Sequence, residues 1–302
     1  MSFPDKTNMA SMLTSCVGKE IAKIEKTDTK KNVLLYFVFA YGFSWLFWIS
    51  QALEAQGVSI PLGFSRFLAS PLCPAAFGPL VAALVLTLIN DGWKGIVALL
   101  KRGISLRFNK VWLFPALLLP LVIFAGSIFM EIWTGTTELD LSVISNPSFA
   151  IVGFFVIVVT AGPLQEEFGW RGYALPRIQA RHNALISSLI LGVLWWLWHL
   201  PLVFIPGKFM VGTLVLFAAL LPVIVLSSIL CTLIFNNTKG SILAAILFHS
   251  SMNWSIWAML PSMKVNASII GFKILFLSLA VALVLAIWGP RRLTKLVDSV
   301  YF

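Results

Sequence analysis

Three groups of polar residues stand inside otherwise apolar stretches of the sequence. The first contains Glu166, the second His199, and the third His249 and Asn253. Near the centre of a bilayer an ionisable side chain costs about 2.5–3.5 kcal/mol on insertion scales, so such residues are functional candidates. A carboxylate, two imidazoles and an amide can together move protons and stabilise a developing negative charge. Their types point to acyl transfer to water.

The spacing within each group decides which side chains can act together. Adjacent residues on an α-helix point about 100° apart, so Glu166 and Glu167 cannot do the same job. Glu167 and Arg171 stand four residues apart and are predicted to pair, which neutralises both charges at the membrane edge. Glu166 is then left to face the interior of a helical bundle. His249 and Asn253 share one helix face and can both donate to one point.

These placements predict a site that activates water. Glu166 would be the general base that takes a proton from a water held between it and His199. His249 and Asn253 would stabilise the oxyanion that forms on the scissile carbonyl. The mechanism needs no serine or cysteine nucleophile, and the sequence contains no G-x-S-x-G elbow. Each group taken alone could instead be structural, as an interhelical hydrogen-bond residue.

Membrane helices are the elements that must position these residues. The chain has 302 residues, of which 59% are hydrophobic and 11% charged, and its mean hydropathy is +0.92. Soluble domains carry about 25% charged residues, so two or three water-soluble domains are excluded. Apolar blocks of about 18 to 25 residues recur along the chain, and each is long enough to cross a bilayer as a helix.

The net charge of +10 comes from 22 Lys and Arg against 12 Asp and Glu. The basic residues fall between apolar blocks, a placement that orients membrane proteins and argues against a nucleic-acid partner. We therefore expect membrane lipids around the chain. The sequence does not set the oligomeric state.

Eight apolar segments predict an all-α fold, a bundle of about eight transmembrane helices. With the N-terminus in the cytoplasm, 18 Lys and Arg fall on the inner side and three on the outer side. The protein is thus expected to be an integral protein of the cell membrane with both termini in the cytoplasm. One membrane domain, 33–288, is expected between polar tails at 1–32 and 289–302. Its segments are 33–53, 70–90, 111–130, 149–165, 184–205, 211–235, 241–260 and 270–288.

This topology also predicts depths. Glu166 and His199 each lie about 24 Å from the polar turn between their segments, so an antiparallel pair places them level. His249 lies about 12 Å from the inner end of its segment, and the levels agree if the hairpin of segments four and five projects about 12 Å into the cytoplasm. The site is therefore predicted inside the membrane, nearer the cytoplasmic side. Lys273 is expected to snorkel to the outer surface, and His182 to be a surface residue.

Three motifs can now be written out. Glu-Glu-x-x-x-Arg occupies 166–171, an aromatic residue stands four positions before a His at Trp195 and His199, and His-x-x-x-Asn occupies 249–253. In this order they resemble the CAAX protease and bacteriocin-processing family, which includes the Ras-converting CAAX endopeptidases and the abortive-infection-type membrane proteins. Phenylalanine is the commoner aromatic in the second motif. The motifs cover roughly 162–253, and the three together are strongly specific.

The resemblance implies an intramembrane glutamate-dependent endopeptidase with an eight-helix core and a cytosol-facing cavity. In that family the residues matching Glu166 and His199 activate water, and those matching His249 and Asn253 form the oxyanion hole. No cofactor is expected, although a zinc site from Glu166, His199 and His249 is formally possible. Prenylated CAAX-type peptides or other membrane-associated peptides would be the substrates. Support of the site is implied for Glu167, Arg171 and Trp195.

Two other classes of protein stay open at this point. A non-catalytic immunity or scaffold protein of the same fold would tolerate loss of any of the four polar residues. A proton-coupled transporter would relay protons through Glu166 and the two histidines, and such proteins often contain paired broken helices in two repeated halves. Gly162 and Pro163 predict a break in the fourth segment, but the first half shows no matching break. Membrane proteolysis is the leading prediction.

Overall fold

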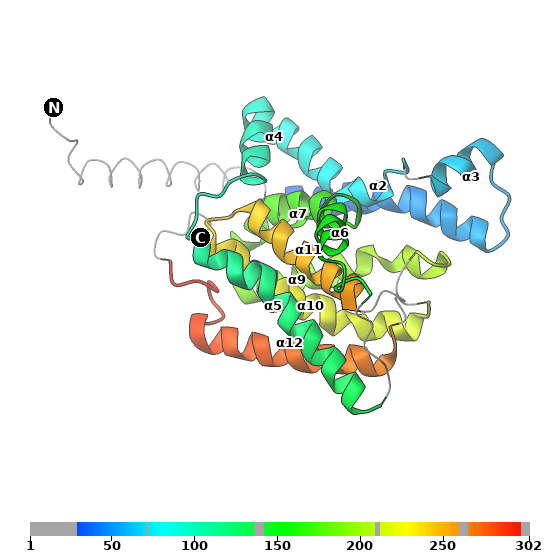
Figure 1. The fold of residues 1–302 in the computed structure, drawn as a ribbon. Coiled ribbons are helices and arrows are strands. Elements are labelled where there is room, and N and C mark those ends of the chain that lie inside the picture. Colours follow the sequence, from blue (N-terminus) through cyan, green and yellow to red (C-terminus); the bar gives the residue numbers. More distant parts are fainter. Residues whose placement is uncertain (1–28, 71, 136–141, 209–211, 260–264, 297–302) are drawn as a thin grey trace.

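The structure is a computed structural model, which describes residues 29–70, 72–135, 142–208, 212–259 and 265–296. This part of the chain is helical and contains no β-strand (Figure 1), which confirms the all-α fold class. Most of the predicted tail at 1–32 and the end of the tail at 289–302 lie outside the described residues. The helices are α2 (Thr29–Ala55), α3 (Leu62–Ala69), α4 (Gly78–Arg102), α5 (Leu113–Trp133), α6 (Pro147–Thr160), α7 (Pro163–Gly169), α8 (Leu175–Gln179), α9 (Ala184–Trp198), α10 (Leu214–Asn237), α11 (Ile242–Met259) and α12 (Ala267–Trp288).

Within the described residues, seven helices are long and apolar enough to cross a membrane, and a bent pair supplies an eighth span if it counts as one. That pair is α6 with the helical stretch Pro163–Gln179, bent by 43°. Each of the eight predicted segments therefore coincides with a helix or with this pair. Two predicted boundaries are wrong. α2 begins inside the predicted tail, and α4 continues to Arg102 through a kink at Gly92, whose φ of 64° lets the chain turn and resume as a helix.

The break predicted at Gly162 and Pro163 is confirmed. Gly162 has a φ of 101°, and Pro163 opens α7 at a position where a missing N–H costs nothing. A Cβ at Gly162 would stand 2.2 Å from Oε1 of Glu166, so a side chain here would collide with that carboxylate. After α7 the chain continues through a π-helix, Trp170–Ala174, into α8. The break thus starts a new helix with Glu166 in its first turn.

The predicted cytoplasmic connections gather at one end of the bundle, which we call the basic end. Ser241 Oγ donates to Ser105 O at 2.9 Å, and Ala184 N donates to Arg291 O at 2.8 Å. These bonds join segments that are far apart in the sequence. The basic end comprises the connections 103–112, 180–183, 238–241 and 289–296.

The hairpin of α8 and α9 does not project beyond this end. Gln179, the last residue of α8, exchanges hydrogen bonds of 3.3 and 3.0 Å with Asn236 in the last turn of α10. The predicted projection of about 12 Å is therefore wrong, because buried amides tie the turn to the neighbouring helix. His182 in that turn is exposed, as predicted.

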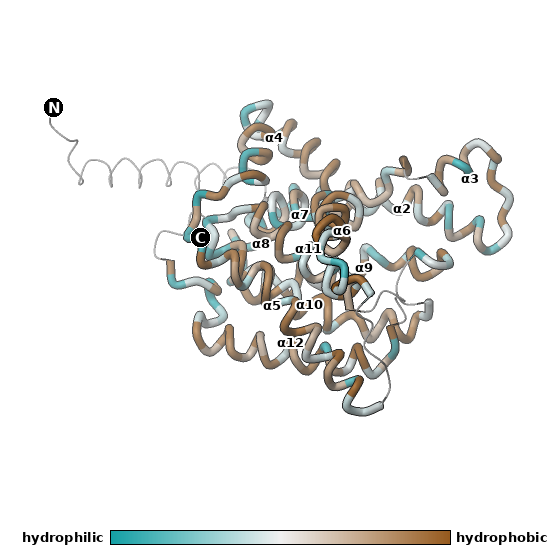
Figure 2. Tube along the Cα trace, viewed as in Figure 1, coloured by the Kyte–Doolittle hydropathy of each residue, from teal (hydrophilic) through white to brown (hydrophobic). Residues whose placement is uncertain are grey.

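Two hydrophobic cores fill the bundle. One joins α5, α10, α11 and α12, and the other joins α2, α4, α7 and α9. The outward faces are also apolar: Phe114, Val122 and Leu283 are each more than 60% exposed. Figure 2 shows this as brown along most helices, with teal mainly at their ends. Apolar surfaces of this extent suit contact with lipid, as expected of an integral membrane protein.

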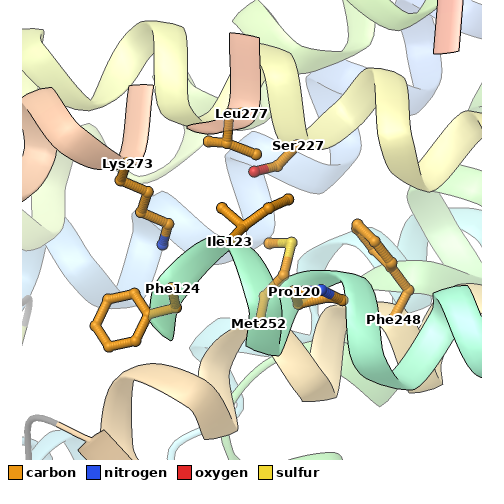
Figure 3. A pocket seen from close by; sticks show the side chains of 8 residues that line it. All are labelled: Pro120, Ile123, Phe124, Ser227, Phe248, Met252, Lys273 and Leu277. Carbon is orange, nitrogen blue, oxygen red and sulfur yellow. The ribbon is translucent and has the colours of Figure 1, made fainter. Parts of the chain in front are cut away.

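The predicted snorkelling of Lys273 is wrong. Its ammonium points into the bundle and lies 5.4 Å from the centre of the Phe124 ring on α5 (Figure 3). Lys273 shares a face of α12 with Ile270 and Leu277, which are both buried against neighbouring helices. Because the Cα of Lys273 lies on this inward face, its side chain extends into the bundle.

Candidate active site

The four predicted catalytic residues line one cavity of about 500 Å³. Glu166 comes from α7, His199 caps the C-terminus of α9, and His249 and Asn253 come from α11. Glu166 and His249 are each only 4% exposed. Much of the remaining wall is apolar and includes Trp48, Ile157, Leu202, Leu220, Ile224 and Trp257.

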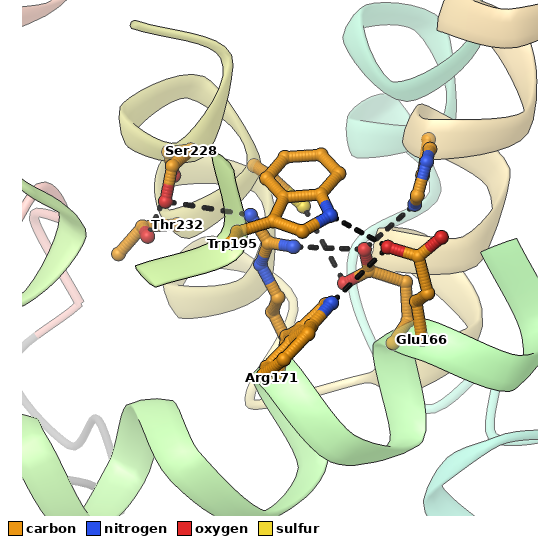
Figure 4. Close-up of polar contacts among 9 residues, drawn as sticks. Glu166, Arg171, Trp195, Ser228 and Thr232 are labelled. Atoms are coloured by element: carbon orange, nitrogen blue, oxygen red, sulfur yellow. Dashed lines mark hydrogen bonds and ion pairs between the residues drawn. The ribbon is translucent and has the colours of Figure 1, made fainter. Parts of the chain in front are cut away.

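The Glu166 carboxylate is held by one of its two oxygens. Oε2 accepts hydrogen bonds from Trp195 Nε1 at 2.6 Å and from Trp170 Nε1 at 3.1 Å (Figure 4). Within the described part of the chain Oε1 accepts no hydrogen bond, and it lies beside Gly162. The indoles therefore fix the carboxylate and leave Oε1 for a ligand or a water.

Glu167 does not line the cavity and belongs to a buried charge cluster behind it. Its Oε1 accepts a hydrogen bond from Arg171 at 2.8 Å and lies 2.8 Å from His249 Nδ1. Its Oε2 lies 3.9 Å from the sulfur of Cys231. The predicted pairing of Glu167 with Arg171 is confirmed. Both side chains are 0% exposed, and Ser228 and Cys231 of α10 lie beside them.

Trp195 connects the cavity with this buried cluster. Its indole donates to Glu166, and its ring lies under the Arg171 guanidinium at 4.8 Å. The same ring meets the His249 imidazole edge-on, with centroids 5.0 Å apart. Its backbone carbonyl lies 2.9 Å from His199 Nδ1. Trp195 therefore touches both histidines, the cavity carboxylate and the buried arginine.

The contact between His199 and Trp195 sets the tautomer of the imidazole. A carbonyl oxygen only accepts, so Nδ1 must carry the proton, and in the neutral ring Nε2 is then the basic nitrogen. The ring also packs edge-on against Trp198 at 4.8 Å between centroids. These contacts hold the imidazole at the end of α9.

Asn253 connects α11 to the helix break. Its Nδ2 donates to the carbonyl of Ala161 at 2.9 Å, immediately before Gly162. An amide nitrogen has two hydrogens, and the described residues take one of them. The other is available to a ligand in the cavity.

The cavity extends away from the basic end. Its lining includes Lys208 in the connection before α10, Trp48 near the end of α2, and Lys273 in the first half of α12. These positions belong to the opposite end of the bundle, so the predicted placement of the site nearer the cytoplasmic side conflicts with the predicted cytoplasmic termini. An orientation that puts the basic end in the cytoplasm directs this cavity toward the outer side.

Comparison with known proteins accounts for the three motifs together. Residues 147–255 match the family described as type II CAAX prenyl endopeptidase Rce1-like. This stretch contains all four predicted catalytic residues. Over that stretch the chain is similar to this family. It is also similar to CAAX prenyl protease 2 of Methanococcus maripaludis, with 26% identity over 237 residues that cover 74% of this chain and 83% of the relative. The resemblance predicted from the motifs is thereby confirmed.

The zinc alternative requires Glu166, His199 and His249 to converge on one point. Among the described residues, no group of three His, Cys, Asp or Glu side chains is placed to hold a metal ion. Glu166, His199 and His249 line the same cavity, but they do not converge as a ligand set.

Sequence reasoning missed several residues around these motifs. Trp170 stands four positions after Glu166, so helical spacing alone could have indicated its hydrogen bond. Ser228, whose Oγ lies 3.5 Å from Arg171, carries no such signal, because small residues are common in membrane helices. The same holds for Cys231. Lys273 was recognised as a charge, but its direction could not be read from its position near the end of a segment.

Proposed function

We propose that this chain is an intramembrane endopeptidase that hydrolyses a peptide bond with water activated by Glu166 and His199. The single observation that supports this best is the convergence of Glu166, His199, His249 and Asn253 on one cavity. These residues come from three helices, and the charged partner of His249 lies outside the cavity. Such an arrangement separates a reactive carboxylate from a structural one.

In this proposal the attacking water lies between Oε1 of Glu166 and Nε2 of His199. Glu166 takes a proton from the water as its oxygen bonds to the scissile carbonyl carbon. The proton then passes to the leaving nitrogen, the C–N bond breaks, and the carboxylate is restored. The indoles of Trp170 and Trp195 hold Oε2, which keeps Oε1 directed at the water.

His249 and Asn253 are proposed to bind the oxyanion. Asn253 has one amide hydrogen left after its bond to Ala161. For Nε2 of His249 to donate while Nδ1 donates to Glu167, the ring must carry both protons, and the Glu167 carboxylate lies where it would balance that charge. A donor of this type is worth about 2.7–4 kcal/mol in the transition state.

We propose a prenylated CAAX-type peptide or another membrane-associated peptide as the substrate. The relative from Methanococcus maripaludis is named a CAAX prenyl protease. The cavity is walled by apolar residues such as Ile157, Leu220 and Trp257, and apolar walls with few polar groups are typical of small-molecule and lipid sites. The proposal involves no cofactor, and membrane lipids surround the protein.

The orientation with both termini in the cytoplasm, and the membrane domain at 33–288, remain part of the proposal. They rest on the distribution of Lys and Arg across the connections. In that orientation the cavity receives its peptide from the membrane or from the outer side. A single cysteine at position 208 in a cysteine-free background would then react with a membrane-impermeant maleimide added to intact cells, and a cysteine at 182 would not.

The proposal is tested with a quenched-fluorescent prenylated CAAX peptide and the purified protein in lipid. Glu166→Gln is expected to lower kcat/KM by at least about a thousandfold, since general-base catalysis contributes about 10²–10⁴ and water activation is lost. Glu131→Gln is the matched control, because Glu131 is a fully buried carboxylate on α5 that does not line the cavity. Turnover by Glu166→Gln at the wild-type rate would contradict the proposal.

Two further arms of this assay address the alternatives. A chelator is expected to leave the rate unchanged, whereas complete and metal-reversible loss would favour the zinc alternative. Absence of cleavage of this peptide and of unmodified membrane peptides by the wild-type protein would favour a scaffold of the same fold.

A further inference from the structure

Lys273 is a cation in the wall of the cavity that the proposed hydrolysis does not use. It lines the cavity together with Glu166 and His249, and it also lines a small recess beside it with Ser227 and Met252 (Figure 3). Among the described residues its ammonium contacts the Phe124 ring at 5.4 Å and forms neither an ion pair nor a hydrogen bond. Lys273 is therefore an inward-pointing charge without a counter-ion.

Placing such a charge in this position costs free energy. An ammonium in apolar surroundings loses much of its hydration, and it is retained where it pairs with another group or binds a ligand. A cation–π contact with phenylalanine offsets only part of that cost, because phenylalanine is a weaker partner than tryptophan. An anionic ligand in the cavity would supply the missing partner.

Comparison with the other charged side chains of the cavity identifies Lys273 as the group that attracts an anion most strongly. In the described lining the charged side chains are Glu166, Lys208 and Lys273. Glu166 is held by two indoles, and Lys208 is exposed in a connection, where solvent screens its charge. Lys273 is half-buried on a transmembrane helix, so its attraction for an anion is screened less.

We propose that Lys273 binds the C-terminal carboxylate of the peptide substrate. This assignment rests on the proposed function and adds a rule of specificity to it. A peptide whose carboxylate is held at Lys273 presents to Glu166 a bond near its C-terminus, because both side chains line the same cavity. Binding would then depend on the free C-terminal carboxylate of the peptide.

The test compares two forms of the prenylated CAAX peptide. One form ends with a free carboxylate and the other with a carboxamide. Binding is measured first, by fluorescence anisotropy in lipid nanodiscs, on the Glu166→Gln protein so that no cleavage intervenes. This protein is expected to bind the free acid at least about tenfold more tightly than the amide, because a charge-assisted contact is lost in the amide. Adding Lys273→Met is expected to weaken binding of the acid to the level of the amide while leaving the amide unchanged.

Two further variants separate recognition from structure. Lys273→Arg keeps the charge and is expected to retain most of the preference. Arg66→Met is the matched control, because it removes one positive charge from α3, where Arg66 is exposed and outside the cavity. If Lys273→Met does not fold, the ratio of acid to amide binding in Lys273→Gln decides.

The outcomes distinguish this inference from the proposed function. Equal binding of acid and amide, or an equal loss for both on Lys273→Met, would overturn the assignment even if wild-type protein cleaves the peptide. A preference for the acid that depends on Lys273, without cleavage by the wild type, would support the assignment of a carboxylate site and overturn the proposed hydrolysis. Binding of neither peptide would overturn the assignment, and the cleavage assay would then decide on the proposed hydrolysis.

Discussion

Glu166 and Glu167 are neighbours in the sequence, yet they belong to two different regions of the molecule. Glu166 lines the cavity, with one oxygen held by two indoles and the other without a partner in the described chain. Glu167 lies behind the cavity, where Arg171 and His249 share one of its oxygens. The Glu166 carboxylate is thus accessible to a substrate, whereas the Glu167 carboxylate is occupied by ion pairs within the protein.

This difference follows from helix geometry and from the break before α7. Adjacent helical residues point about 100° apart, so a helix that borders a cavity turns one of two neighbours into it and the other into the packed bundle. Gly162 allows the chain to turn and start α7 at the cavity wall. In the proposed mechanism the two glutamates therefore have separate roles: Glu166 takes part in the reaction, and Glu167 holds the His249 imidazole.

After Glu166→Gln, the largest effect on the cavity side is expected from His199→Ala. Removing the imidazole that orients the attacking water should lower kcat/KM by about 10²–10⁴ without unfolding the protein. His182→Ala is the control, since His182 is exposed in the turn before α9. Peptide cleavage and thermal unfolding are measured on both proteins. Full activity of His199→Ala would place water activation on Glu166 alone.

On the buried side the corresponding change is Arg171→Met. It leaves the Glu167 carboxylate buried without its arginine, and breaking a fully buried pair costs about 3–5 kcal/mol. Arg181→Met, at an exposed position in the α8–α9 turn, should change stability by less than about 0.5 kcal/mol. Denaturant unfolding in detergent compares the two. Equal stabilities would show that the buried cluster is not structural.

A smaller effect is expected from Trp170→Phe, which removes one of the two hydrogen bonds to Glu166 Oε2. With Trp195 still in place, kcat/KM should fall about tenfold, which corresponds to the roughly 1.4 kcal/mol of one hydrogen bond to a charged group. Trp196→Phe is matched to it, because its indole donates to Phe217 O and not to the cavity carboxylate. An equal fall in both variants would mean that the indoles act only through packing.

The helices and the motif positions could be predicted from the sequence because both depend on local features. Apolar blocks of membrane-spanning length give the helices, and the pair formed by Glu167 and Arg171 follows from a spacing of four residues. The break at Gly162 and Pro163 could be recognised for the same reason. Resemblance to the family motifs then supported the prediction that the three polar groups form one site.

The rotation of each helix about its axis could not be predicted. In a membrane both the lipid-facing and the packed faces are apolar, so hydrophobic periodicity does not mark the inner face. On α12, Leu277 is buried and Leu275 and Leu279 are exposed, although all three are leucines. The direction of Lys273 depends on this rotation, which is why it was assigned to the wrong side. The direction of the cavity relative to the basic end also depends on packing between helices, so it could not be read from the sequence.

The most direct test of the central claim is a parallel measurement of activity and unfolding for Glu166→Gln and Glu167→Gln. Both changes remove one negative charge and keep the shape of the side chain. The account predicts that Glu166→Gln abolishes cleavage of the peptide while its unfolding midpoint stays at or above that of the wild type. It predicts that Glu167→Gln lowers the midpoint because Arg171 and His249 lose their counter-charge. Cleavage that survives in Glu166→Gln, or a loss of stability confined to that variant, would contradict the account.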